Sequence, residues 1–186
     1  MSLIEAWRGN RQNVPNVDPQ DGGVRAKVLC LLESPGPRSV VEGGTGFISR
    51  DNPDPSARNM TKFLADAGLD RGDTLLWNAV PYCVSSATKN RNASPAQIRE
   101  AAPYTQAFID LLPELRVVVF CGRRAQLAIP HLHIRVPILT TYHPALRSYR
   151  QPRCREHLHA TMAEAHAMLE PGSRPGAMAV TGVKAK

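Results

Sequence analysis

Four continuous apolar runs of strand length recur along the chain. They cover residues 27–33, 73–80, 115–121 and 137–142. Uninterrupted apolar character is typical of strands that are buried on both faces, as in a parallel sheet. Segments with helical patterns separate the runs, and a strand–helix alternation requires right-handed crossovers between parallel strands. The pattern therefore predicts an α/β fold: a three-layer α/β/α sandwich around a central four-stranded parallel sheet.

Four helices are expected around this sheet. They are placed at residues 58–67, at residues 94–112, just after Gly122, and at residues 155–169. The first has Met60, Phe63 and Leu64 on one face, and Gly68 is well placed to end it. The second begins with a capping box, in which Ser94 is the N-cap and Gln97 the third helical position.

The remaining segments define the expected domain organisation. Residues 1–24 are rich in Asn, Gln, Asp, Gly and Pro without periodicity, which indicates an irregular N-terminal arm. Residues 25–170 form a single domain, and residues 171–186, which begin with Pro and Gly, are expected to be a disordered tail. Residues 34–57 form a long Gly- and Pro-rich loop, and such loops inside compact domains are usually functional.

Composition narrows the class of protein. The chain has 186 residues and 42% hydrophobic content, which suits one globular domain. It contains no apolar run of membrane-spanning length and no signal-peptide core at its start. We therefore expect a cytoplasmic protein with no membrane partner, and a monomer because no dimerisation helix is evident.

The charge balance favours a phosphate-rich partner. The net charge is +7, and Arg outnumbers Lys by 18 to 5. Guanidinium groups bind phosphate through paired hydrogen bonds that ammonium groups cannot form. Simple solubility is the alternative and would scatter the charge. Instead, four arginines follow His143 closely, at Arg147, Arg150, Arg153 and Arg155, which favours a nucleic-acid surface.

Three polar motifs follow strands of the predicted sheet. Glu33, Ser34 and Gly36 come after the first strand, Asn78 ends the second, and His143 follows the fourth. Open α/β sheets bind ligands at the carboxyl ends of their strands. One pocket is therefore expected to hold Glu33, Asn78 and His143.

The order and content of these motifs resemble the uracil-DNA glycosylase superfamily, over residues 27–168. The stretch Leu32-Glu33-Ser34-Pro35-Gly36 is similar to the glycine-glutamate-alanine-proline-glycine motif of the iron-sulfur branch, with Leu32 and Ser34 as replacements. Each motif alone is common in loops, but three in this order after strands are more specific. The resemblance implies a DNA glycosylase that flips uracil out of DNA and hydrolyses its N-glycosidic bond, leaving an abasic site in base excision repair.

The resemblance also assigns the residues that would bind the base. Asn78 would pair with uracil O4 and N3–H, which cytosine cannot match. Phe47, in a glycine-rich segment, would stack on the base. Gly36 stands where the best-known uracil enzymes have a tyrosine that blocks the methyl group of thymine, so thymine must be excluded in another way or is not fully excluded.

The chemistry and the DNA contacts follow from the same comparison. His143 would donate a hydrogen bond to uracil O2 as negative charge develops there. Glu33 would position the water, since Ser34 replaces the aspartate or asparagine of other branches; the alternative is that Ser34 and nearby backbone hold the water. Leu146 and Arg147 would enter the base stack, and Arg150 would contact DNA.

The cysteines argue against a bound cluster. The four cysteines contain no C-x-x-C pair. The iron-sulfur branch uses an N-terminal cysteine pair and two cysteines after the Asn strand; here Cys83 matches one position and Ala101 occupies the other. A cluster needs four ligands, so we expect no metal and no cofactor. Cys30 and Cys121 lie in apolar strands and are expected to be core residues.

Two alternatives to a uracil enzyme remain open at this point. The first is a broader glycosylase that acts on mismatched or other deaminated bases. The second is a catalytically silent nucleic-acid-binding homologue, which the unusual Ser34 supports. Uracil release from DNA separates all three.

Overall fold

A four-stranded parallel sheet forms the centre of the molecule. The computed structural model describes residues 14–40, 44–85 and 91–170. The strands are β2 (Val28–Leu32), β4 (Thr74–Asn78), β5 (Val117–Cys121) and β6 (Ile138–Thr141). Their order in the sheet is β4-β2-β5-β6, and every neighbouring pair is parallel. All four predicted strands are confirmed, each within a few residues of its expected bounds.

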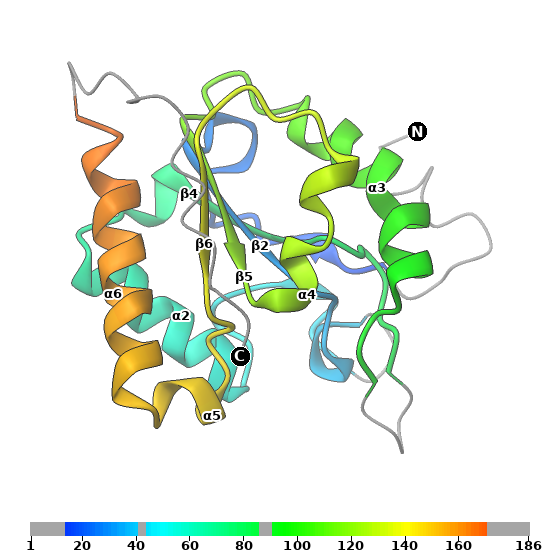
Figure 1. Cartoon of the computed structure of the whole chain (residues 1–186), viewed down its shortest axis with the longest axis horizontal. Helices are drawn as coiled ribbons and strands as arrows, with labels where there is room; N and C mark the ends of the chain where they lie inside the picture. The colour runs from blue at the N-terminus through cyan, green and yellow to red at the C-terminus, as the bar shows by residue number, and fades with distance from the viewer. Residues whose placement is uncertain (1–13, 41–43, 86–90, 171–186) are drawn as a thin grey trace.

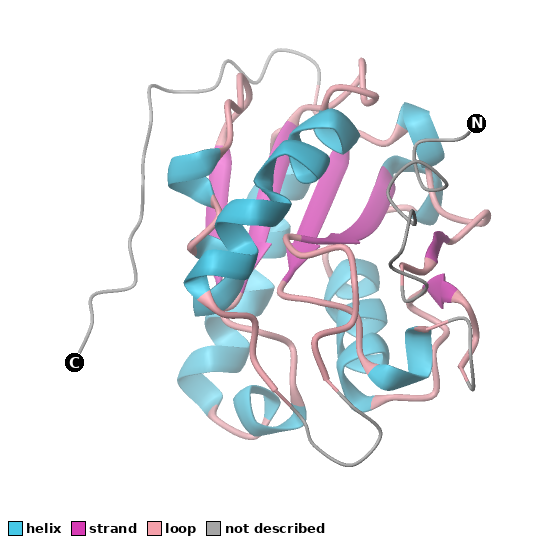
Figure 2. Cartoon of the chain, turned by 90° about the vertical axis from the view of Figure 1, so that its right-hand side faces the viewer, coloured by secondary structure: helices cyan, strands magenta, loops and turns pink. Residues whose placement is uncertain are grey.

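Helices cover both faces of this sheet. One layer contains α2 (Pro55–Asp66) and α6 (Pro152–Ala167), and the other contains α3 (Pro95–Ile109) and α4 (Arg123–Gln126), as Figures 1 and 2 show. The predicted α/β class with a central parallel sheet is therefore confirmed. Among the helices that the structure describes, none is long and apolar enough to cross a membrane.

The strand order places a topological switch point between β2 and β5. From β2 the chain goes to β4 at one side, and it then returns to β5 at the other side of β2. Loops that follow β2 and β5 consequently leave the sheet in opposite directions and open a crevice between them. Glu33 follows β2 and Gly122 follows β5, so both lie at this crevice.

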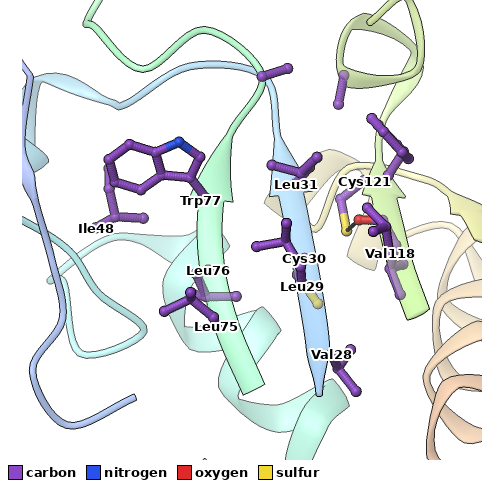
Figure 3. Packing of buried hydrophobic residues seen from close by; sticks show 14 of the residues in the cluster. Val28, Leu29, Cys30, Leu31, Ile48, Leu75, Leu76, Trp77, Val118 and Cys121 are labelled. Atoms are coloured by element: carbon purple, nitrogen blue, oxygen red, sulfur yellow. Dashed lines mark hydrogen bonds between the residues drawn. The ribbon is translucent and has the colours of Figure 1, made fainter. Parts of the chain in front are cut away.

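The core is built on the sheet and explains why its strands are continuously apolar. Every residue of β4 and β5 is buried, and so are the first four residues of β2. Trp77 stacks on Phe108 of α3 with ring centroids 4.4 Å apart, a contact worth about 0.5–1.5 kcal/mol beyond burial. Cys30 of β2 and Cys121 of β5 are fully buried (Figure 3), as expected for core residues.

Helix boundaries shift where prolines and caps decide them. Helix α2 begins at Pro55 rather than Arg58, because the Asp54 carboxylate caps it. Helix α3 begins at the expected capping box of Ser94 and Gln97. Helix α6 begins at Pro152, three residues earlier than predicted, with proline in its first turn.

The long loop after β2 has more structure than its composition indicated. It contains a short 3₁₀ helix, η2 (Pro37–Ser39), and strand β3 (Phe47–Ile48). Strand β3 pairs in parallel with β1 (Asn16–Val17), which belongs to the N-terminal segment expected to be irregular. A helix that the sequence did not predict, α5 (Leu146–Tyr149), follows the His-Pro motif. The tail expected at 171–186 lies outside the described residues.

Buried ion pairs fasten this N-terminal segment to the domain. Arg50, which is 6% exposed, lies 3.2 Å from the Asp21 carboxylate and donates a hydrogen bond to Thr74 of β4. Arg71 bridges Asp21 and Asp18, at 3.1 and 2.6 Å. Burial raises the pKa of Asp21, although the charge of Arg50 opposes that rise. The network fixes the loop that carries β3 against the edge of the sheet.

Candidate active site

A cavity of about 680 Å³ opens at the carboxyl ends of the strands. This size is within the range of small-molecule pockets. The lining residues come from the end of β2 and its loop, from the start of α2, from β4 and the segment after it, from the end of β5 and the start of α4, and from residues 143–148. The cavity therefore lies at the switch point that the strand order predicts.

Six of the predicted site residues line this cavity, and three do not. Those that line it are Glu33, Ser34, Gly36, Asn78, His143 and Arg147. Phe47, Leu146 and Arg150 are absent from the lining. The motifs from three different strands thus converge, as expected from their positions at strand ends.

Asn78 presents an unpaired amide to the cavity. It is the last residue of β4 and is only 3% exposed. None of the described residues forms a hydrogen bond with its side-chain amide. The backbone around it is paired, because the Ala79 N–H donates to the Leu32 carbonyl at 2.8 Å. The amide lines the open cavity, so its donor and its acceptor are accessible to a ligand. A ligand that both accepts and donates would satisfy it.

His143 has a defined tautomer. Its Nδ1 accepts a hydrogen bond from the Ala145 N–H at 3.1 Å, so the neutral ring carries its proton on Nε2. Burial lowers the pKa of His143, and the negative charge of Asp54 acts in the opposite direction. The ring is therefore neutral at pH 7, with Nε2–H available as a donor.

Two contacts hold the His143 loop in place. Gly122 has φ +96°, and a Cβ at this position would lie 2.9 Å from the His143 Cβ. Only glycine allows this approach without strain. On the other side, Asn59 of α2 donates a hydrogen bond to the Pro144 carbonyl at 2.8 Å. The sequence predicted no role for Gly122 beyond the start of a helix, although its position directly after a buried strand is a signal for one.

Glu33 is half-buried at the end of β2 and is already partly engaged. Its Oε1 accepts a hydrogen bond from the Ala93 N–H, and Arg124 donates to the Ala93 carbonyl at 3.3 Å. Burial raises the pKa of Glu33, while the Ala93 N–H and the charge of Arg124 oppose the rise. One carboxylate oxygen remains available to the cavity.

Ser34 and Gly36, which follow Glu33, leave open space at the cavity. Ser34 is half-buried, and its hydroxyl makes no hydrogen bond with any described residue. Gly36 is exposed, with φ −74° and ψ 163°, an extended conformation that any residue adopts. A Cβ at Gly36 would meet nothing within 4 Å. The backbone therefore does not require glycine at this position.

The β3 wall of the cavity is aliphatic in this structure. Ile48 is 6% exposed and lines the cavity, whereas Phe47 is 37% exposed and does not. Successive side chains in a strand point to opposite faces, so only one of the two can face the cavity. The structure places Phe47, the expected stacking residue, outside the lining.

Arginines surround the cavity. Five of them line it: Arg38, Arg91, Arg123, Arg124 and Arg147. Most are exposed, and they come from four separate segments of the chain. Leu146 and Arg150 are exposed on and just after α5, beside this surface. The arginines after His143 were predicted from the sequence. Arg123 and Arg124 were not, because they lie far from that group in the chain and join it only at the cavity.

The last feature of the site is its capacity to bind a metal ion. Within the described residues, no group of three or more His, Cys, Asp or Glu side chains could hold a metal ion. Cys83 is half-buried, and its thiol lies 3.6 Å from the Ser85 carbonyl. The four cysteines are all free.

Comparison with known proteins identifies the family of this chain. The model of the uracil DNA glycosylase superfamily matches residues 19–165, which is more than half of the chain. This range contains every segment that lines the cavity. A search of curated proteins found none that matches. On the strength of the family match, the chain belongs to the uracil-DNA glycosylase superfamily.

Proposed function

We propose that the protein is a monofunctional uracil-DNA glycosylase. Family membership supports a DNA glycosylase function in general. The observation that carries the choice of uracil is the buried Asn78 amide, which faces the cavity without a partner among the described residues. No metal or cofactor is part of the proposal, and a monomer approaches the DNA from its arginine-rich side.

The base is recognised through Asn78. The amide NH₂ donates to uracil O4, and the amide oxygen accepts from N3–H. Cytosine presents an amino group and an unprotonated N3 at these positions, so it offers the opposite pattern. Because Asn78 ends a buried strand, its position is fixed by the sheet. A flipped base would therefore be read against a rigid amide.

His143 stabilises the departing base. As the C1′–N1 bond breaks, its electron pair leaves with uracil and negative charge collects on O2. The Nε2–H of His143 donates to this oxygen, since Nδ1 is occupied by the Ala145 N–H. One preorganised donor of this kind is worth about 100-fold or more in turnover.

Glu33 positions the water. Its free carboxylate oxygen accepts a hydrogen bond from a water molecule whose oxygen then bonds to C1′, and the proton that the water releases passes through solvent to the uracil anion. The products are free uracil and an abasic site. Ser34 is the alternative residue for the water, because its hydroxyl lines the same cavity. Arg147 and Arg150 contact phosphates, and Leu146 enters the space that the flipped base leaves.

A uracil-release assay on single-stranded and duplex oligonucleotides tests the proposal, together with Asn78→Asp. The aspartate cannot donate to O4, so uracil release should fall by roughly 100-fold, consistent with sites that read a base by hydrogen bonds. Gln20→Glu, which makes the same charge change at an exposed position, should keep wild-type rates. Unchanged uracil kinetics in Asn78→Asp would exclude this recognition.

One observation favours a second candidate function, a glycosylase of broader range. The open space around Gly36 leaves room for substituents on the base. A thymine opposite guanine, or another deaminated base, would then enter the cavity. The same assay with mismatched and hypoxanthine-containing duplexes separates this possibility from strict uracil specificity.

A further inference from the structure

Asp54 is a carboxylate of the cavity that the sequence motifs do not include. It precedes α2, lines the cavity and is half-buried. Its Oδ1 accepts hydrogen bonds from the N–H groups of Ser56 and Ala57, both at 2.9 Å. Its Oδ2 makes no hydrogen bond with any described residue. The side chain is thus held by one oxygen and offers the other.

Asp54 and His143 both line the cavity. Helices α2 and α5 lie side by side (Figure 1), and α2 also anchors the His143 loop through Asn59 and the Pro144 carbonyl. Burial lowers the pKa of His143, and the negative charge of Asp54 acts in the opposite direction. Both groups are therefore within electrostatic range of each other.

The shared cavity and the action of the Asp54 charge on the His143 ring both point to the sugar as the group that Asp54 affects. In the proposed function, on which this inference rests, His143 donates to uracil O2. That oxygen is separated from C1′ of the sugar only by C2 and N1 of the base. A charge beside His143 consequently acts on the sugar as well. During cleavage the sugar is oxocarbenium-like and carries positive charge.

We propose that Asp54 is a further catalytic residue, whose free carboxylate oxygen faces the flipped deoxyribose and stabilises its positive charge in the transition state. The C1′–N1 bond breaks with its electron pair on uracil, water adds its oxygen to C1′, and the proton that the water loses passes through solvent to the uracil anion. Asp54 forms no bond and takes no proton. A carboxylate fixed by two backbone N–H groups needs no reorganisation when this charge develops.

This role accounts for the unusual first motif. Ser34 cannot carry a negative charge, and Glu33 shares its carboxylate with the Ala93 N–H. Asp54 reaches the same cavity from the far end of the loop, so the fold supplies a second carboxylate where the motif lacks one. The cap on α2 fixes its orientation.

The test uses Asp54→Asn and Asp54→Ser in the full chain. Both residues are good N-caps, so both retain the α2 cap while the charge is lost. Asp66→Asn, an exposed carboxylate on the same helix, is the matched control. Single-turnover uracil release should fall about tenfold or more in both Asp54 variants, with unchanged unfolding midpoints and no loss of DNA affinity. Asp66→Asn should keep the wild-type rate.

A second substrate separates Asp54 from His143. 5-Fluorouracil leaves more readily than uracil because fluorine stabilises the anion, so it should restore much of the rate lost in His143→Ala. It should restore less in Asp54→Asn, where the defect lies on the sugar. Full activity of both Asp54 variants in an active wild-type background would overturn the inference and leave the proposed function intact. A wild-type protein without any uracil release would overturn both.

Discussion

Replacing Gly122 with alanine should disable the site by displacing His143, although the substitution removes no group that contacts the base. Gly122 follows β5 at the switch point, has φ +96°, and packs against the His143 backbone. An added Cβ would lie 2.9 Å from the His143 Cβ and 3.4 Å from both its Cα and its backbone N. These atoms are at the root of the residue, so the ring cannot rotate away from the contact. His143 must move as a whole.

The size of the effect follows from two contributions. A non-glycine residue in this backbone conformation costs about 1–3 kcal/mol of folding free energy. An ordinary carbon–carbon contact is about 3.5–4.0 Å, so relief of the clash requires a shift of about 0.6–1.1 Å. A catalytic group misplaced by about 1 Å loses up to about 100-fold in rate. We therefore expect a 10- to 100-fold fall in uracil release.

The chain offers a matched control for the backbone strain. Gly68 also has positive φ, +74°, and its added Cβ would meet only the edge of the His166 ring, at 3.7 Å. Gly68→Ala should therefore lose similar folding free energy in urea titrations and keep wild-type turnover. Equal turnover of Gly122→Ala and Gly68→Ala, each corrected for the folded fraction, would refute the claim that Gly122 positions His143.

Two further predictions concern the first motif. Burial raises the pKa of Glu33. As pH rises toward this pKa, the unfolded state loses its proton before the folded state does, so the wild type loses stability. Glu33→Gln should remove this loss of stability in urea titrations from pH 4 to 8, and it should slow turnover. An identical pH profile of stability in both proteins would contradict it. Gly36→Tyr should fold normally, because no atom lies within 4 Å of its Cβ, and should release uracil while rejecting 5-methyl bases. Equal loss on both substrates would place Gly36 away from C5.

The sequence by itself determined the architecture. Continuous apolar runs marked β2, β4, β5 and β6 because strands of a parallel sheet are buried on both faces, a property that local composition records directly. The alternation with helices then required parallel pairing. The placement of Glu33, Asn78 and His143 in one cavity followed from the same rule, since parallel strands bring their carboxyl ends to one edge.

Only the tertiary structure decided how loops complete the site. Strands β1 and β3 have two residues each, too few to show a periodicity, and their pairing exists because the ion pairs of Arg50 hold the segments together. That pairing turns Ile48 rather than Phe47 toward the cavity. The contact of Gly122 with His143 and the approach of Asp54 likewise join segments far apart in the chain. Local patterns report burial and propensity, whereas loop conformation depends on long-range contacts that no local pattern contains.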